Sequence, residues 1–528
     1  MLVALTACVG ENEAKRGRIG FVEGFLGGVA ADEPRAALVG RDILSAGGSA
    51  ADAATAIYFA LAVTLPSSAG LGGGGVCLVH DWKTATTETL EFLTRAPSAV
   101  PDSATRPSAV PANARGFFAL HTKYGKMRWQ QVVGPGEGLA RFGFQVSRAL
   151  SIDMRQVEAA LAAESSILRM FGRPDGKGLV AEGDFLTQVE LAATLGRISR
   201  LGPGDLHGGQ MAPALVEGAV AAGGSLTVED LRAHVPVWRG TVKVQMGNRT
   251  AHFTPPPAAA GAVGAQMLAM LLDDDRYKST SPEGHPHLLA EAALRAFADR
   301  GQWLTPRGSS KVPVLELTSA ARIDGLIASY DQKRHVPSAD LDPAPVERPE
   351  NPAATSFVVV DRTGSAIACA LTMNNLFGTG RIAGTTGILL AALPGQAGRG
   401  PTSLGPMMVI NHNVNEFFFA GASSGGVTAP TALVGVALRT LVDGLPLEDA
   451  LSAPRLHHGG LPDLVYHEQN LGASAQRSLT GRGHHIAATP KLGRVNAAHC
   501  GGGLPPNPDT CVVRTDRRGF GLAVGAGR

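Results

Sequence analysis

The chain has almost no net charge, since its 528 residues include 47 basic and 45 acidic side chains, a formal balance of +2. A surface that follows a nucleic-acid backbone needs a large basic excess, so we expect no nucleic-acid partner. The sequence also lacks the run of about 18 apolar residues that a membrane-spanning helix needs. Charged residues make up 17% and hydrophobic residues 44%, which argues against disorder and for a large folded core.

Cysteine is scarce, with five residues in the chain. Cys8 follows Leu-Thr-Ala, the small-residue pattern of a bacterial lipoprotein cleavage site, although the basic start and most of the apolar stretch of a secretory signal are absent. Two explanations stay open: residues 1–25 are a leader shortened by a start codon assigned too far downstream, or Cys8 is an accident of a frayed terminus. The first predicts a periplasmic protein whose only membrane contact is a lipid anchor at Cys8.

The other cysteines lie in two settings. Cys500 and Cys511 flank a loop rich in Gly and Pro, and we expect them to form a disulfide in an oxidising compartment. Cys77 and Cys369 lie in apolar runs typical of strands, and we expect them to be buried as small hydrophobic residues.

Glycine and proline are abundant, with 67 and 34 residues, and they punctuate the predicted elements. A helix of small residues is expected from Gly47 to Thr64, followed by four glycines (72–75) and a strand (76–80). Consecutive glycines at such a junction indicate that the backbone passes close to another group. The pattern from residue 117 to about residue 327 is mostly helical.

A buried hairpin follows an exposed linker in the second half of the chain. Five prolines between 337 and 352 exclude a long helix or a central strand there. Directly after them, two apolar runs joined by Asp361-Arg-Thr-Gly364 predict a hairpin that is buried on both faces. Further strands (416–420 and 510–514) alternate with a helix (429–441), so we expect α/β layers up to the C-terminus.

One stretch has the pattern of a serine hydrolase. Gly421-Ala-Ser423-Ser-Gly425 matches Gly-x-Ser-x-Gly, and Asp443 and His457 follow it in the order of a hydrolase triad. A Gly-rich turn between strand and helix can equally supply backbone donors to an oxyanion. We prefer the second interpretation and keep a Ser423 hydrolase as an alternative.

Histidine pairs at 285/287, 457/458 and 484/485 raise the question of a metal ion. We find none of them joined by a carboxylate or a cysteine at ligand spacing on one helix face, so we interpret them as surface or capping residues and expect no metal. The phosphate-binding pattern Gly-x-x-x-x-Gly-Lys is absent, and we expect no cofactor.

Thr355 and Ser356 stand at the start of the buried strand. One interpretation is a pair of strand-capping hydroxyls. The other is that cleavage before Thr355 exposes a threonine that carries both nucleophile and base, since a free α-amine titrates near pH ~7.7–8.0 and can accept the hydroxyl proton. That chemistry needs a cleavable linker, a rigid strand and backbone donors that face the hydroxyl, and the sequence offers a candidate for each.

A series of motifs in fixed order runs through nearly the whole chain: Gly47-Gly-Ser-Ala-Ala-Asp-Ala, Gly72-Gly-Gly-Gly75, Thr254-Pro-Pro-Pro257, Ala296-Phe-Ala-Asp-Arg300, Asp361-Arg-Thr-Gly364, Phe377-Gly-Thr-Gly380, Gly387-Ile-Leu-Leu390, Gly425-Gly426, Ala453-Pro-Arg-Leu-His-His458 and Leu461-Pro-Asp463. Together they resemble the γ-glutamyltransferase family of N-terminal-nucleophile hydrolases. The resemblance implies an α/β fold of the α+β type, a four-layer αββα sandwich. It also implies a precursor that cuts itself into a large subunit (26–354) and a small subunit (355–528), and that acts on γ-glutamyl or related amides through an acyl-enzyme.

The resemblance assigns roles to several residues. Gly425 and Gly426 match the backbone donors of the oxyanion hole, which makes Ser423 a loop residue. Thr372 matches the threonine that supports the nucleophile from the next strand. Asn374 matches a residue that binds the α-carboxylate of the substrate, and Ser403 matches a substrate-binding serine.

The chain departs from the family at the nucleophile. Counted back from Asp361 without gaps, the family's threonine falls on Ala354, and Thr355 is one residue late. A slip of one residue turns a side chain to the other face of a strand unless a bulge or a free end corrects it. We favour Thr355 as the nucleophile, with an uncut, non-catalytic binding protein and a Ser423 hydrolase as the two alternatives.

The predicted glutamyl pocket departs as well. Leu93 replaces the family's carboxylate-binding arginine, and Arg95, two residues later on the same strand face, is our candidate to substitute for it. Leu393 and Gln396 replace the family's Gln and Asp that hold the α-amino group, and without that carboxylate the charge-assisted bond to an ammonium is lost. We therefore expect a small amide or peptide substrate whose acyl part lacks a free α-amino group.

Overall fold

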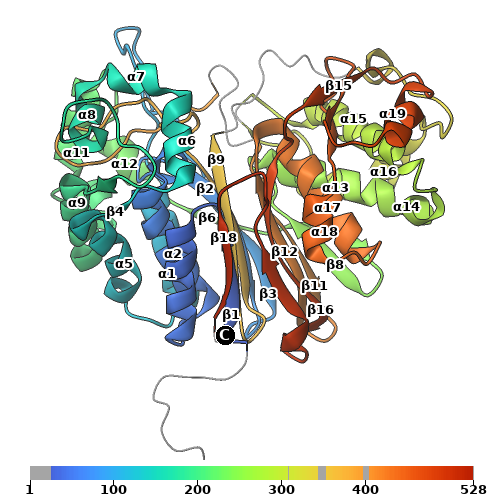
Figure 1. Cartoon of the computed structure of the whole chain (residues 1–528), viewed down its shortest axis with the longest axis horizontal. Helices are drawn as coiled ribbons and strands as arrows, with labels where there is room; N and C mark the ends of the chain where they lie inside the picture. Colours follow the sequence, from blue (N-terminus) through green and yellow to red (C-terminus); the bar gives the residue numbers. More distant parts are fainter. Residues whose placement is uncertain (1–24, 307, 343–352, 396–402, 527–528) are drawn as a thin grey trace, which may run out of the picture.

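Two large β-sheets pack face to face, and helices cover the outer face of each (Figure 1). The computed structural model describes residues 25–306, 308–342, 353–395 and 403–526. The first sheet has the strand order β18-β1-β9-β10-β2-β3-β6, and the second has the order β17-β16-β12-β11-β8-β7. This arrangement is the expected four-layer αββα sandwich.

All neighbouring strands of both large sheets run antiparallel. The strands of the first sheet are β18 (Leu522–Ala526), β1 (Gly27–Ala31), β9 (Ala354–Asp361), β10 (Ala366–Thr372), β2 (Gly74–Asp81), β3 (Thr86–Phe92) and β6 (Val237–Arg239). Those of the second are β17 (Cys511–Arg514), β16 (Arg494–Leu504), β12 (Glu416–Ser424), β11 (Met407–Asn411), β8 (Arg249–Phe253) and β7 (Val242–Met246). Smaller sheets are formed by β13 (Leu456–His458), β14 (Val465–Glu468) and β15 (Ile486–Thr489), and by β4 (Phe144–Gln145) and β5 (Phe185–Leu186).

Strand β9 is apolar at both its even-numbered and its odd-numbered positions, because both of its faces are buried. Its even-numbered residues Val358 and Val360 pack between the two sheets, with Met408 of β11 in the same cluster. Its odd-numbered residues Phe357 and Val359 pack against the first helical layer. Because successive side chains point to opposite faces of a sheet, a strand at the centre of four layers needs apolar residues at both parities.

The first helical layer is built largely from small side chains. Helix α2 (Ala50–Thr64) is buried along its whole length, which its many alanines allow. It begins at a capping box in which the Ser49 side chain accepts from the Asp52 amide and the Asp52 carboxylate accepts from the Ser49 amide. Around it lie α1 (Pro34–Ser45), α4 (Asn113–Tyr124), α5 (Trp129–Phe142) and α9 (Val189–Leu201).

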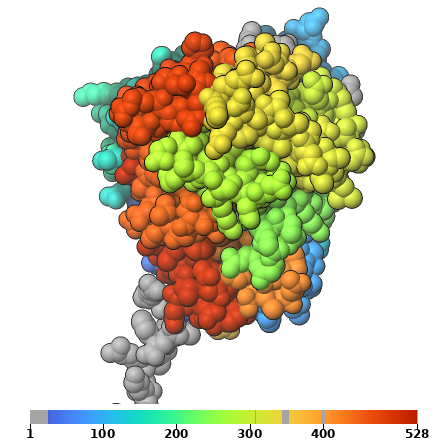
Figure 2. All heavy atoms as spheres, turned by 90° about the vertical axis from the view of Figure 1, so that its right-hand side faces the viewer, coloured from blue at the N-terminus to red at the C-terminus, as the bar shows by residue number. Residues whose placement is uncertain are grey.

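The second helical layer contains α13 (Ala259–Leu272), α15 (His285–Trp303) and α17 (Ala429–Leu441), which share one apolar cluster with the outer face of the second sheet. Seen from this side, green segments of the middle of the chain lie between orange and red segments of its last part, and yellow segments lie at the upper right (Figure 2). The remaining helices are α3 (Pro66–Ala69), α6 (Arg148–Gln156), α7 (Glu158–Ala162), α8 (Ser165–Phe171), α10 (Gly204–Gly208), α11 (Ala212–Ala221), α12 (Val228–Ala233), α14 (Arg276–Ser279), α16 (Ala320–Ile327), α18 (Leu447–Ser452) and α19 (Ala473–Thr480).

The parts of the chain before and after residue 354 interleave. Strands β1, β2, β3 and β6 of the first sheet come from the first part, and β9, β10 and β18 come from the second. The second sheet is mixed in the same way, with β7 and β8 beside β11. Subunits cut near residue 354 would therefore share both sheets, although the division at 354/355 itself stays a prediction.

Five strands lie where the sequence pattern indicated mostly helix, and two of them, β4 and β5, have only two residues each. Strands β6, β7 and β8 fall between residues 237 and 253, inside the range expected to be helical. That expectation is wrong for this segment. Strand β7 alternates buried and exposed side chains along Val242-Lys-Val-Gln-Met246, a period of two that a shorter window would have detected.

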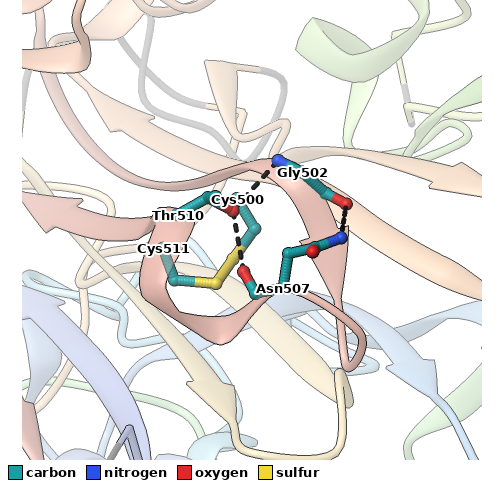
Figure 3. The surroundings of a disulfide bond; sticks show 5 residues. All are labelled: Cys500, Gly502, Asn507, Thr510 and Cys511. Carbon is teal, nitrogen blue, oxygen red and sulfur yellow. Dashed lines mark hydrogen bonds between the residues drawn. A yellow bond between two sulfur atoms is a disulfide. The ribbon is translucent and has the colours of Figure 1, made fainter.

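The cysteines form two disulfides. Cys500 and Cys511 face each other across β16 and β17 and are bonded, as expected (Figure 3). The loop that joins these strands is held by Asn507, whose side-chain amide donates to the Gly502 carbonyl at 2.6 Å. Cys77 of β2 and Cys369 of β10 are buried, as expected, but they are also bonded to each other, which the expectation of two small hydrophobic residues missed.

The leader expected at residues 1–25, with the anchor candidate Cys8, lies outside the described residues except for Phe25. No helix in the described ranges is long and apolar enough to cross a membrane.

Candidate active site

The start of β9 presents alanine, not threonine, to the space between the sheets. Ala354 belongs to an apolar cluster between the layers and lines a cavity at the end of the strand. Thr355 points to the opposite face, where its hydroxyl donates to Asp32 Oδ2 at 3.0 Å, and it is fully buried. Ser356 points inward again, and its hydroxyl donates to the Ala422 carbonyl of β12. The structure therefore does not bring the Thr355 hydroxyl to the cavity.

Thr372 lies directly across from Ala354 in the β9–β10 register. Its hydroxyl donates to the carbonyl of Ala353 at 2.6 Å and accepts from the Asn374 amide at 2.9 Å. A threonine in this position can steady the first residues of β9, which is the role that the resemblance implies for it.

The candidate oxyanion loop follows β12. Gly425 and Gly426 have φ angles of +129° and +66°, which side-chain-bearing residues rarely adopt. A Cβ on Gly425 would come within 2.7 Å of Gly493 Cα, so a larger residue does not fit. Gly425 lines the same cavity as Ala354, so backbone of this loop and the end of β9 face one space.

The cavity has a volume of about 640 Å³. Its walls come from helices α3 and α6, the start of β9, the loop after β12, the β13–β14 turn and the segment before β16. This volume lies in the range of pockets that hold small organic ligands.

Cations outnumber carboxylates on the cavity wall. Lys491 and Arg494 line it beside Asp153, the one carboxylate in the lining found among the described residues. Burial raises the pKa of Asp153, and its Oδ2 accepts a hydrogen bond from Ser67 at 2.6 Å. Arg518 also lines the cavity, but it is paired with carboxylates outside the lining.

Arg494 reaches across the gap between the sheets. Its Nη2 donates to the Ala354 carbonyl at 3.0 Å and its Nε donates to Ser424 Oγ at 3.2 Å. The guanidinium is thereby fixed between the end of β9 and the strand that leads into Gly425. No sequence pattern pointed to this residue.

The residues of the alternative serine triad have separate partners. The Ser423 hydroxyl is buried and donates to the Ala429 carbonyl at 2.8 Å. Asp443 accepts from Tyr277, and Nδ1 of His457 lies 3.1 Å from the Thr431 hydroxyl. Burial lowers the pKa of His457 to about 3, so this cavity-lining ring is neutral at physiological pH.

On the other side of Ala354, apolar side chains pack where the resemblance predicts the glutamyl pocket. Leu93, Ala258 and Leu404 pack with Ala354 in one apolar cluster. The Asn374 side-chain amide, expected to bind a substrate carboxylate, donates to Thr94 Oγ1 at 2.7 Å and to the Ala392 carbonyl at 2.8 Å. Its N–H groups are thus engaged within the protein.

The remaining candidates of the pocket lie apart from the cavity. Arg95 has a half-exposed side chain, 3.6 Å from the Glu91 carboxylate, and it is not part of the cavity wall. Ser403 and Leu393 are buried and also lie outside the wall. Gln396 lies outside the described residues.

The histidines form a buried network that sequence analysis missed. His287 and Glu291 lie one turn apart on α15, and His287 Nδ1 is 2.7 Å from His484 Nε2. The statement that no histidine has a carboxylate at helical spacing is therefore wrong, and the spacing of four residues between His287 and Glu291 was the available signal. Glu291 already pairs with Arg295 and His335, so its charge is balanced without a metal ion.

A sequence profile of the family described as gamma-glutamyltranspeptidase matches residues 36–393 and 394–525. The chain belongs to this family. It is 30% identical over 516 residues to the glutathione hydrolase proenzyme of Escherichia coli (strain K12). This alignment covers 90% of this chain and 88% of that protein. It is also 30% identical over 521 residues to the acylase ACY 1 proenzyme of Pseudomonas sp. (strain V22), with 90% of each chain covered.

The structure of cephalosporin acylase from Bacillus halodurans superposes with a TM-score of 0.77 at 21% identity, covering 98% of this chain and 99% of that one. This likeness shows the same fold. The chain is thus a γ-glutamyltranspeptidase-family member of the N-terminal-nucleophile hydrolases, an enzyme family whose relatives named here are hydrolases and acylases. The resemblance drawn from the motifs is confirmed, while the roles of single residues stay predictions.

Proposed function

We propose that this member of the γ-glutamyltranspeptidase family remains a single chain and binds a small ligand in its cavity without a covalent step. One observation carries the proposal. The strand position that faces both Thr372 and the cavity holds the methyl group of Ala354, while the Thr355 hydroxyl is bonded to Asp32 on the far face of β9.

In catalysis by an N-terminal threonine, the hydroxyl oxygen attacks the carbon of a substrate carbonyl, while backbone N–H groups donate hydrogen bonds to the oxygen of that carbonyl. Moving Thr355 into the cavity by sliding the whole of β9 one residue would turn Phe357 and Val358 to the wrong layers. Both side chains are fully buried, so the shift would disrupt the packing of two layers.

Intact-mass measurement of the purified protein tests the proposal. We expect one species that carries both sides of residue 354, with a mass close to 54.4 kDa if no leader is removed. Two fragments, with the smaller beginning at Thr355, would contradict it. A fragment that begins at Ser356 would contradict it too and would move the nucleophile.

A gain-of-function variant tests the position more sharply. Ala354→Thr places a hydroxyl across from Thr372, and we expect this variant to cut itself before residue 354. The matched control is Ala354→Val, which has the shape of threonine without the hydroxyl and should stay whole. If Ala354→Thr also stays whole, the loss of function does not lie at this position alone.

A self-processing amidase that uses Thr355 is the second candidate, and one observation favours it. Arg494 donates to the carbonyl of the Ala354–Thr355 bond, and Asp32 accepts from the Thr355 hydroxyl. A polarised carbonyl next to a hydroxyl with a carboxylate acceptor is what cleavage of this bond would use. If the chain is found cut there, Asp32→Asn should block cleavage and Asp153→Asn should not.

We also propose that the protein resides in an oxidising compartment, the periplasm, because both disulfides join adjacent strands of the core sheets. Thiol titration of the denatured protein should find one reactive thiol of the five cysteines before reduction and all five after it. Equal counts would contradict the proposal.

A further inference from the structure

The cavity beside Ala354 carries a fixed excess of positive charge on a largely apolar wall. We propose that it binds an amphiphilic monocarboxylate, an apolar chain that ends in a single carboxylate, with the carboxylate held by Arg494 and Lys491. The inference rests on the proposed function, since it names the ligand class of the same cavity.

Arg494 is positioned before any ligand arrives. Two of its nitrogens are held by Ala354 and Ser424, so the orientation of the guanidinium is already fixed. Its Nη1 group makes no hydrogen bond within the described part of the chain. A guanidinium in a fixed orientation loses little conformational entropy when it binds a carboxylate, which favours affinity.

Lys491 supplies a second positive charge. It lines the cavity and makes no ion pair with any residue in the described ranges. Asp153 opposes these two cations with one carboxylate, and Arg518 is neutralised by Glu468 and Asp516. Arg300, a further wall residue, has its guanidinium over the Phe297 ring. Lys491 and Arg494 together exceed the charge of Asp153 by one, which matches a carboxylate better than a phosphate dianion.

The rest of the wall selects an apolar body. Ile152, Leu376, Val427, Leu461 and Phe520 line the cavity, and its volume of about 640 Å³ far exceeds that of a carboxylate. Burial of apolar surface stabilises a complex by about 25 cal/mol per Å² before the entropic costs of association. A ligand that combines an acyl chain with one carboxylate satisfies both kinds of wall.

Calorimetric titration of the full-length protein with N-octanoylglycine tests the inference. We expect saturable binding with one ligand per chain, and affinity that weakens as salt concentration rises because the carboxylate bonds are electrostatic. N-octanoylglycinamide, which has the same body without the charge, should bind at least about tenfold more weakly. N-acetylglycine, which has the charge without the body, should also bind at least about tenfold more weakly.

Single-residue variants assign the contacts. Lys491→Met and Arg494→Met should each weaken binding of N-octanoylglycine about tenfold or more, and Arg494→Lys should weaken it too because a point charge cannot replace the fixed fork. The control is Arg514→Met, at an exposed arginine of β17 outside the cavity wall. It removes one charge and should leave the affinity unchanged. Since Arg494→Met removes bonds to Ala354 and Ser424, its thermal unfolding is measured alongside, and Lys491→Met serves as the variant without such bonds.

Three results would overturn the inference: no binding of N-octanoylglycine, equal binding of its uncharged amide, or equal or tighter binding of octyl phosphate. Tighter binding of γ-glutamyl-octylamide, which carries a free ammonium, would also contradict it. Chromatography of the titrated mixture shows whether N-octanoylglycine has been hydrolysed, so the proposed function is tested separately from the ligand class. Release of octanoate would refute the absence of a covalent step, while the affinities would still decide the ligand class.

Discussion

Two regions meet at Ala354, and they differ in how they are filled. The closed side is the apolar cluster of Leu93, Ala258 and Leu404, which pack with Ala354 where the resemblance predicts the glutamyl pocket. The open side is the cavity with Lys491 and Arg494 on its wall. Both sides contact Ala354 at the start of β9. The backbone is therefore shared, and the two sides differ in the volume and the charge of the side chains that surround them.

The closed side should not tolerate the charge that the family resemblance would restore. Leu93 is 2% exposed, and Leu93→Arg would place a guanidinium in an apolar cluster. We expect a loss of about 3–5 kcal/mol in the free energy of unfolding, the cost of an unpaired buried charge. Urea denaturation followed by circular dichroism measures it.

Leu93→Met is the matched control for that change. It keeps the volume and the apolar character of the side chain, so the loss should stay below about 1.5 kcal/mol. If Leu93→Arg costs no more than Leu93→Met, the closed side has room for a charge after all, and the contrast between the two sides fails.

Substitution of Asn374 tests how much its side-chain hydrogen bonds stabilise the closed side. Asn374→Ala removes the side-chain bonds to Thr94 and Ala392, and we expect a loss of about 2 kcal/mol in the free energy of unfolding. Asn374 has a φ of +61°, a left-handed conformation that alanine adopts only with strain.

Asn374→Gly therefore separates the two contributions. It loses the same hydrogen bonds without the strain and should be up to about 1 kcal/mol more stable than Asn374→Ala. Denaturation of both variants under one set of conditions gives the difference. Two variants as stable as the parent would mean that the amide contributes nothing to closing this side.

The elements with strong local signals were predictable from the sequence. Helix α17 has the predicted bounds 429–441, and the apolar runs around Asp361-Arg-Thr-Gly364 form the hairpin of β9 and β10. These segments combine a clear period with turn residues at their ends. Strand β7 was missed because its five residues lie within a long stretch whose average period is helical.

The candidate site was predictable only where a motif carried it. Thr372 lies across from Ala354, and Gly425 lines the cavity at the end of β9, while the roles that the resemblance predicts for them stay predictions. Lys491, Arg494 and Asp153 could not be found in this way, because their meeting depends on the packing of α6 against the segment before β16. Alternation counted from Asp361 predicts that Thr355 faces away from the site, but whether a bulge corrects this at the strand end is shown only by the register with β10.

The smallest effect is expected for a substitution of His457 on the open side, and it concerns how the free energy of unfolding depends on pH. Its pKa is lowered to about 3 in the folded chain by burial, whereas an unfolded histidine titrates near pH ~6.5. Between these values the unfolded state binds a proton that the folded state does not, so stability falls as the pH decreases. His457→Gln removes this proton, and its free energy of unfolding should fall by about 1 kcal/mol less than that of the parent between pH ~6.5 and ~5.5. The control is Leu93→Met, on the closed side, whose free energy of unfolding should depend on pH as that of the parent does. If His457→Gln also shows the pH dependence of the parent, the open side does not bury this ring.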